Sequence, residues 1–529
     1  MSERKLSGSG SRYAVATPHV AATDAARSAF EAGGNAIDAA IAAATTLAVV
    51  YPHMCGVGGD LFALVQRPEG DVVAINSTGP SSRRIDPDAV RAAHGTSMPE
   101  RGPFTVTVPG AVGGWWALHR RGAWLAWPDL FEAAVSHASG VPVAHSLADT
   151  LAWGVDRGLP ADPGLSSVFY PDGPPLPEGA ILVQPTLRAT LAALAAEGPN
   201  ALYGGEIGER FARGLREAGV PIEPSDLAGH EATTLAPLIG RYRDLDVRVA
   251  PPTSQGFVLL EILAAVEHLG IDPDPLGPDA GTLALLFRAA SLDRDHYLAD
   301  PEHMRVHPHA LLDDGHIAAL SDVVRTGRPV AVDAVPGSPG GTVGLATADA
   351  EGYAVCLIQS LGPGFGAGIL EPSTGIVAQG RGSGFVLDPA HPNVLEPRKL
   401  PAHTLMPVMA HRDGRLAAIS ATMGGSAHPQ INMMSLVRAL ELGRSPAEAV
   451  AEPRWLAGAM DPVGPDPFVV AERSAAERVG EALTRAGFRV DELEDGSEDV
   501  GHAHLIVVGS DGTFRAGTDP RADGGAAAG

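Results

Sequence analysis

The sequence has little lysine and little cysteine. Lys5 and Lys399 are the only lysines among 38 Lys and Arg residues. A pyridoxal Schiff base and a P-loop each need a lysine at a set place. Lys5 lies in a polar stretch and Lys399 follows no glycine-rich loop, so both classes are disfavoured. Cys55 and Cys356 can form at most one disulfide, which gives no sign of a stapled secreted scaffold.

Excess positive charge and long apolar runs are also missing. The formal net charge is −24, so the surface repels nucleic acid and anionic membranes. The longest largely apolar run, residues 39–50, is too short to cross a bilayer. Residues 1–12 are polar and lack the apolar core of a signal peptide. We therefore expect a cytoplasmic protein without a nucleic-acid or membrane partner.

The usual catalytic motifs are absent as well. There is no G-x-S-x-G, H-E-x-x-H or C-x-x-C, and no G-x-G-x-x-G between a strand and a helix. Two groups of histidines match no standard zinc spacing: His303, His307 and His309, and His502 with His504. Ordinary surface or core histidines explain them better, and no metal site is predicted.

Glycine and proline are plentiful, yet the chain reads as folded. Together they make up about a fifth of the 529 residues, below the share typical of disordered proteins. Apolar patterns predict one or two alanine-rich helices over 21–50 and a strand over 61–65. Helical patterns with polar breaks fill about 111–240, with the clearest helices at 187–196 and 207–218, and a further helix follows at 257–269.

The segment of about 302–341 changes character and is the best linker in the chain. Its last part, 333–341, is rich in proline, glycine and serine, which sustain neither helix nor central strand. Short strands are predicted immediately afterwards, at 342–348, 353–359, 375–378, 405–410 and 416–420.

Gly340-Gly341-Thr342 stands where that linker meets the first of these strands. A threonine with a free α-amine is a complete catalytic unit, because the hydroxyl attacks while the amine, with a pKa of about 7.7–8.0, acts as base. Such an amine appears if the Thr342 hydroxyl attacks the Gly341 carbonyl and cleaves the chain. Taken locally, an ordinary β-branched strand residue is the simpler interpretation.

Two glycine-rich turns follow later in the chain. Met423-Gly424-Gly425 could aim backbone N–H groups at a developing oxyanion, although an ordinary turn is the simpler interpretation. Arg381 stands among glycines in residues 379–385. A lone guanidinium in an acidic protein indicates a carboxylate ligand, with a surface arginine as the alternative.

These residues and others resemble the γ-glutamyltransferase (glutathione hydrolase) family of N-terminal-nucleophile hydrolases. The resemblance extends over nearly the whole chain. It rests on motifs in the family's order: 33–40, 56–60, Pro109-Gly110, 251–256, Asp293-Arg294 with 297–301, Gly424-Gly425 and 519–524.

The resemblance implies an α+β fold, the four-layer α/β/β/α sandwich of N-terminal-nucleophile hydrolases. It also implies a precursor cleaved between Gly341 and Thr342 into a large part, 1–341, and a small part, 342–529, which together form one composite domain. Thr342 is then the nucleophile, and Ser360 supports its amine. Gly424 and Gly425 build the oxyanion hole. The residues expected to contact the substrate are His403, Thr404 and Thr78.

The sequence departs from the γ-glutamyl pattern at the substrate headgroup. The stretch that should hold a carboxylate-binding arginine, residues 75–80, contains none. Gly362 and Gly384 replace residues that grip the α-amino group, and Arg381 replaces a loop glutamine. These departures resemble the branch that contains oxamate amidohydrolase. Arg381 is therefore expected to bind the carboxylate of a small amide.

The resulting expectation is an amidohydrolase that needs no metal or organic cofactor. Its partners are a small carboxylate-bearing amide and the two parts of its own precursor, and a dimer of such heterodimers is left open. Three alternatives stay open: a γ-glutamyltransferase proper, a glutaryl or cephalosporin-type acylase, and a catalytically inactive binding protein.

Overall fold

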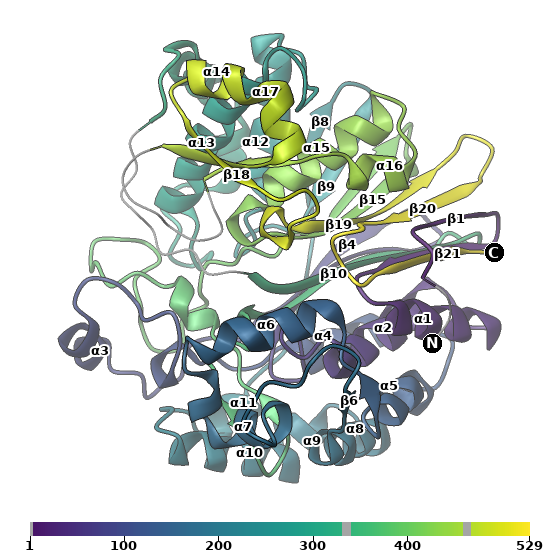
Figure 1. The fold of residues 1–529 in the computed structure, drawn as a ribbon, viewed down its shortest axis with the longest axis vertical. Coiled ribbons are helices and arrows are strands. Elements are labelled where there is room, and N and C mark those ends of the chain that lie inside the picture. Colours follow the sequence, from purple (N-terminus) through teal and green to yellow (C-terminus); the bar gives the residue numbers. More distant parts are fainter. Residues whose placement is uncertain (1–3, 331–339, 459–466) are drawn as a thin grey trace.

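The computed structural model describes residues 4–330, 340–458 and 467–529. Within these ranges two large β-sheets are stacked face to face, and helices cover the outer face of each sheet (Figure 1). The strands of both large sheets pair antiparallel. No helix in the described ranges is both long and apolar enough to cross a membrane.

The first sheet holds the strands around Thr342. Its order is β21-β2-β10-β11-β3-β4-β7. Strands β11 and β3 are almost wholly apolar and buried, as expected for strands covered on both faces. In sheet order, the strand bounds are Gly525–Ala528, Tyr13–Thr17, Gly340–Asp349, Ala354–Pro363, Asp60–Gln66, Val72–Ser77 and Thr233–Leu235.

The second sheet packs on the first. Its order is β1-β20-β19-β15-β14-β9-β8, and β15 and β19 lie against β10. Small residues allow close contact there, since a Cβ on Gly344 of β10 would lie 2.8 Å from the Ala421 backbone of β15. In sheet order, the strand bounds are Ser7–Gly10, Phe514–Thr518, His502–Val508, Arg415–Met423, Val408–Arg412, Leu245–Val249 and Leu238–Tyr242.

Three helices cover the first sheet: α1 (Val20–Glu31), α2 (Ala36–Val50) and α4 (Ala111–His119). Every residue of α2 is buried, and its many alanines let it lie close to β10 and β11. The helix begins at a capping box in which the Asn35 side chain accepts backbone N–H groups and Asp38 accepts the Asn35 N–H.

The second sheet is covered by α12 (Gly256–Leu269), α15 (His428–Leu440) and α16 (Pro446–Ala451). Three more helices pack with this layer: α13, α14 and α17, with bounds Ala280–Tyr297, Asp314–Arg325 and Arg473–Arg485. They appear together in the upper part of Figure 1.

The remaining elements are short or lie outside these layers. The helices are α3 (Pro87–His94), α5 (Glu132–His137), α6 (His145–Val155), α7 (Pro163–Phe169), α8 (Pro185–Glu197), α9 (Asn200–Tyr203), α10 (Glu206–Glu217) and α11 (Pro224–Ala228). The small strands are β5 (Val141–Pro142), β6 (Ile181–Leu182), β12 (Leu370–Glu371), β13 (Ile376–Val377), β16 (Trp455–Ala457), β17 (Phe468–Glu472) and β18 (Arg489–Leu493). The 3-10 turns are η1 (Pro103–Thr105), η2 (Trp127–Phe131), η3 (Leu159–Ala161), η4 (Pro308–Leu312), η5 (Arg381–Gly384), η6 (Gly425–Ala427) and η7 (Glu498–Val500).

Segments from before and after Gly341 alternate in both large sheets. In the first sheet, β10 and β11 lie between β2 and β3, and β21 lies beyond β2. In the second, β1 pairs with β20 and β9 pairs with β14. Neither the segment before Gly341 nor the segment after it therefore forms a complete large sheet alone.

The predicted fold class, an α+β four-layer sandwich, is confirmed. The stretch 21–50 forms two helices, and the helices predicted at 187–196, 207–218 and 257–269 are α8, α10 and α12. Two details differ. The segment 302–341 contains the helix α14, and the strand expected to begin at Thr342 begins at Gly340 because the two glycines continue the pairing with β11. The proline-rich run 333–339 lies outside the described residues.

Candidate functional site

Thr342 and Ser360 face each other on neighbouring central strands. The register of β10 and β11 pairs Thr342 with Ser360 and shifts between Gly341 and Thr342. Such a bulge re-aims a side chain. The Thr342 hydroxyl donates to Oγ of Ser360 at 2.9 Å, and both residues are buried. The glycine before Thr342 is required, since a Cβ on Gly341 would lie 2.5 Å from the Pro363 carbonyl oxygen.

Ser360 Oγ takes part in four hydrogen bonds of this site. Its hydroxyl donates to the Gly341 carbonyl oxygen at 2.6 Å. It accepts from the Gly362 N–H and from Nη2 of Arg381, each at 2.9 Å. The carbonyl that Ser360 polarises therefore belongs to the peptide bond that joins Gly341 to Thr342.

Arg381 brings a buried positive charge to Ser360. It lies at the start of η5 and is 8% exposed. Burial lowers the pKa of Arg381 to about 10, although the charge of Asp60 opposes the shift, so the guanidinium is protonated at neutral pH. Its Nε has no hydrogen-bond partner in the described part of the chain. A buried guanidinium held by a neutral hydroxyl is poorly compensated.

Asp60 extends the row of polar side chains onto a third strand. The register of β11 and β3 pairs Ser360 with Asp60. The strands meet closely here because position 59 is glycine, where a Cβ would lie 2.4 Å from the Ser360 carbonyl oxygen. Oδ1 of Asp60 accepts from Nε2 of Gln379 at 3.0 Å and from the Gly79 N–H at 3.3 Å. Burial raises the pKa of Asp60 to about 7, against the opposing charge of Arg381.

His403 lies on the other oxygen of Asp60. Its Nδ1 accepts from the Leu405 N–H at 3.3 Å, so Nε2 carries the proton and donates to Oδ2 of Asp60 at 3.2 Å. Burial and the charge of Arg381 lower the pKa of His403 well below its usual value. The imidazole of His403 is therefore neutral, and both of its ring nitrogens are hydrogen-bonded within the protein.

The two other predicted contact residues flank this centre. Thr78 is buried, donates to Oδ1 of Asn76 and precedes Gly79, which contacts Asp60. Thr404 is half-buried, and its carbonyl accepts from Nε2 of Gln255 at 2.7 Å. Their predicted roles toward a substrate stay predictions.

The Gly424-Gly425 turn lies against the strand of Thr342. It joins β15 to α15, and η6 packs on β10. Gly425 has φ +54°, which favours glycine there, and a Cβ on Gly424 would lie 2.3 Å from Cδ1 of Ile431, so a larger residue at 424 would require that side chain to move. Nε2 of Gln255 donates to the Gly425 carbonyl at 3.0 Å and holds the turn.

The structure thus brings together Thr342, Ser360 and Arg381, which the sequence indicated, and adds two residues that it did not assign. Asp60 and Gln379 belong to the glycine-rich stretches 56–60 and 379–385, but no role was predicted for either of them. The signal that could have revealed Asp60 is its position after Gly58-Gly59, since paired glycines mark close backbone approach.

The histidine groups considered for metal binding lie elsewhere. His502 and His504 are buried and contact each other, with Nδ1 of His504 on Oγ1 of Thr518 at 2.7 Å. His307 and His309 are exposed, and their rings stack where the turn η4 begins. The interpretation as ordinary core and surface histidines accounts for these contacts.

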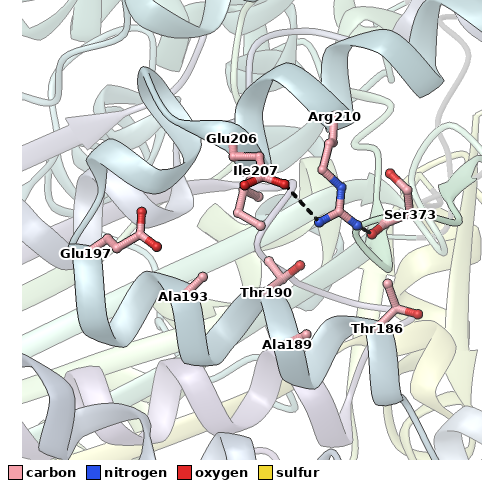
Figure 2. Close-up of a pocket in the computed structure, with 9 residues that line it drawn as sticks. All are labelled: Thr186, Ala189, Thr190, Ala193, Glu197, Glu206, Ile207, Arg210 and Ser373. Atoms are coloured by element: carbon pink, nitrogen blue, oxygen red, sulfur yellow. Dashed lines mark hydrogen bonds and ion pairs between the residues drawn. The ribbon is translucent and has the colours of Figure 1, made fainter.

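A separate hollow lies between α8 and α10 (Figure 2). Its volume is about 210 Å³, and Arg210 pairs there with Glu206 of the same helix and donates to the Ser373 carbonyl. It shares no residue with the site around Thr342. The chemistry available at Thr342 is different: a buried hydroxyl, a donor on the adjacent carbonyl and a buried guanidinium are linked by successive hydrogen bonds.

A family comparison identifies a match over almost all of the chain. The family model described as gamma-glutamyltranspeptidase matches residues 22–529.

Two relatives are similar over nearly their full lengths. The oxamate amidohydrolase proenzyme of Klebsiella pneumoniae is 36% identical, over 96% of this chain and 97% of the relative. The glutathione hydrolase-like YwrD proenzyme of Bacillus subtilis is 33% identical, over 98% of both. Among solved structures, the cephalosporin acylase from Bacillus halodurans has a TM-score of 0.90 at 30% identity, over 100% of this chain and 98% of that one.

Proposed function

Because the chain belongs to the gamma-glutamyltranspeptidase family, whose enzymes act on C–N bonds, we propose that it is a self-cleaving N-terminal-threonine amidohydrolase that hydrolyses a small amide carrying a carboxylate. The observation that carries this proposal is the buried Arg381 guanidinium, which contacts Ser360 Oγ, the same oxygen that receives the Thr342 hydroxyl.

Maturation is proposed to begin at the Gly341–Thr342 peptide bond. The Thr342 Oγ1 attacks the Gly341 carbonyl carbon, the C–N bond breaks, and its nitrogen takes up the hydroxyl proton. The resulting ester is hydrolysed by water, which leaves a carboxylate on Gly341 and a free amine on Thr342. The Ser360 hydroxyl, 2.6 Å from the Gly341 oxygen, supports the proposal because it can stabilise the negative charge on that oxygen.

The two products, 1–341 and 342–529, are proposed to stay together as large and small subunits. The alternation of their strands in both large sheets supports this, because separation would expose central strands. The cleaved protein is therefore one composite domain built from two chains.

Turnover is proposed to use the same hydroxyl with the new amine. The Thr342 α-amine takes the hydroxyl proton as Oγ1 attacks the substrate carbonyl, and passes it to the leaving amine. The N–H groups of Gly424 and Gly425 are proposed to hold the oxyanion, and the packing of their turn against β10 supports this. Water then releases the acid, with an amine acceptor as the alternative.

Arg381 is proposed to bind the substrate carboxylate. One oxygen, Ser360 Oγ, separates Nη2 of Arg381 from Oγ1 of Thr342, with 2.9 Å on each side. A carboxylate on Arg381 and a carbonyl carbon at Thr342 must therefore lie only a few bonds apart in the substrate. A carboxylate would also accept the Arg381 N–H groups in a charge-assisted pair.

Asp60 is proposed to orient His403 through their hydrogen bond, and His403, Thr404 and Thr78 are proposed to contact the substrate. A second candidate, an acylase for amides of dicarboxylic acids, is favoured by the full-length likeness to the solved acylase. A cytoplasmic location is proposed from the sequence alone, and cell fractionation tests it.

The test compares Thr342→Ala with Thr342→Ser. We expect Thr342→Ala to stay uncleaved and inactive, whereas Thr342→Ser cleaves itself and retains amidase activity. Purified wild type is assayed on oxamate, a glutaryl amide, a γ-glutamyl anilide and an uncharged amide of matched size. Preference for the small carboxylate amide supports the proposal, and activity of Thr342→Ala would refute it.

A further inference from the structure

Three acidic and imidazole side chains converge in the helical layer on the second sheet. Glu261 lies on α12, Asp293 on α13 and His316 on α14, and the three helices pack pairwise (Figure 1). Nε2 of His316 lies 2.9 Å from Oδ2 of Asp293 and 3.5 Å from Oε1 of Glu261. One ligand atom from each residue falls within 4.8 Å of the other two.

Glu261 is the unusual member of this group. Its side chain is 0% exposed, and neither carboxylate oxygen has a hydrogen-bond partner among the described residues. Buried carboxylates are normally paired and hydrogen-bonded, or else bound to a metal ion. A single contact with His316 at 3.5 Å leaves most of the acceptor capacity of Glu261 unused.

The donor set fits a divalent transition metal. One imidazole nitrogen and two carboxylate oxygens are ligands that Zn²⁺ accepts at about 2.0–2.2 Å. Ligand atoms bound at that distance lie roughly 3–3.5 Å apart, which the contacts of His316 already approach. The side chains of Asp293 and His316 are 15% and 25% exposed, so the group opens to solvent and leaves room for water ligands.

We propose that Glu261, Asp293 and His316 form a binding site for one divalent transition-metal ion, with Zn²⁺ as the fitting probe. The site shares no residue with the Thr342 centre and supplies no step of the proposed reaction. Its ligands come from three helices that are separate in sequence, so the ion would tie α12, α13 and α14 together.

Metal binding at this site would also restrain the Gly424-Gly425 turn. Gln255, which precedes α12, donates to the Gly425 carbonyl, and Arg294, which follows Asp293, donates to the Ser426 carbonyl at 3.0 Å. Holding α12 and α13 together therefore fixes the two donors that support Gly424 and Gly425.

The test is calorimetric titration of Zn²⁺ into the full-length protein, freed of its affinity tag and of metal by chelator and dialysis. Wild type should bind one Zn²⁺ per chain and unfold at a higher temperature with the ion. Glu261→Gln replaces a carboxylate ligand with a neutral amide and His316→Ala removes the imidazole, so we expect each to lower Zn²⁺ affinity by at least the roughly 10- to 100-fold that loss of an outer-shell partner causes.

His268→Ala is the matched control, because His268 is an exposed histidine on α12 that the proposal does not use. It should bind Zn²⁺ as wild type does. If one site variant fails to fold, the other still tests whether the ion binds at this group. Three results would overturn the proposal: no stoichiometric binding of Zn²⁺ to wild type at concentrations of about 100 µM, binding of Zn²⁺ to both site variants as tight as to wild type, or a loss of affinity in His268→Ala as large as in the site variants.

Discussion

Arg381→Met should change which substrates the enzyme accepts. The substitution keeps much of the side-chain length but removes the guanidinium that contacts Ser360. Removing one partner of a buried charge pair costs about 3–5 kcal/mol, which corresponds to a fall of roughly 140- to 4,000-fold in kcat/KM for a carboxylate amide. An uncharged amide of the same shape leaves no carboxylate unpaired, so its kcat/KM should change little.

The assay measures the ratio of kcat/KM for the two substrates in each protein. The ratio cancels the amount of matured enzyme and any effect of Arg381 on Ser360, since both substrates share them. Ser383→Ala, on the same η5 turn, is the control and should keep the wild-type ratio. Equal losses on both substrates in Arg381→Met would refute the assignment of Arg381 to the carboxylate.

Two further predictions concern the neighbours of Thr342. Ser360→Ala removes the donor on the Gly341 carbonyl, so we expect the rate of self-cleavage to fall by about 100-fold or more. Denaturing electrophoresis over time measures this rate, and cleavage at the wild-type rate would contradict the role of Ser360. The second prediction concerns Asp60, whose pKa is raised to about 7 in the folded protein. Between about pH 4 and pH 7 the folded state holds a proton that the unfolded chain has released. The free energy of unfolding therefore falls as pH rises through this range, by about 1.4 kcal/mol per pH unit. Asp60→Asn should lose this contribution, so the urea midpoint of unfolding should fall less between pH 5 and 7.5 in this variant than in wild type. An identical fall in the two proteins would contradict the prediction.

The sequence predicted the layers well because local patterns and motif order carry them. The helix α2 within the alanine-rich stretch 21–50 and the apolar strand 61–65 are buried on all sides, and their composition shows this directly. Helix α14 was missed because it follows a polar, proline-containing stretch, although its buried residues Ile317, Leu320 and Val324 have helical spacing.

The site was predictable only in part. Thr342 and Arg381 stand in glycine-rich contexts that attract notice in the chain. The row of Thr342, Ser360 and Asp60 depends on strand register across β10, β11 and β3, which no local pattern specifies. The Glu261 group was missed for the same reason, since its three members come from separate helices and share no spacing.

The central claim is that Thr342 becomes the N-terminal residue of a small subunit. Intact mass and N-terminal sequencing of the purified protein test it most directly. We predict two fragments, the smaller one spanning 342–529 and beginning with Thr342. A single active chain of 54.3 kDa, or a small fragment that begins at another residue, would contradict it.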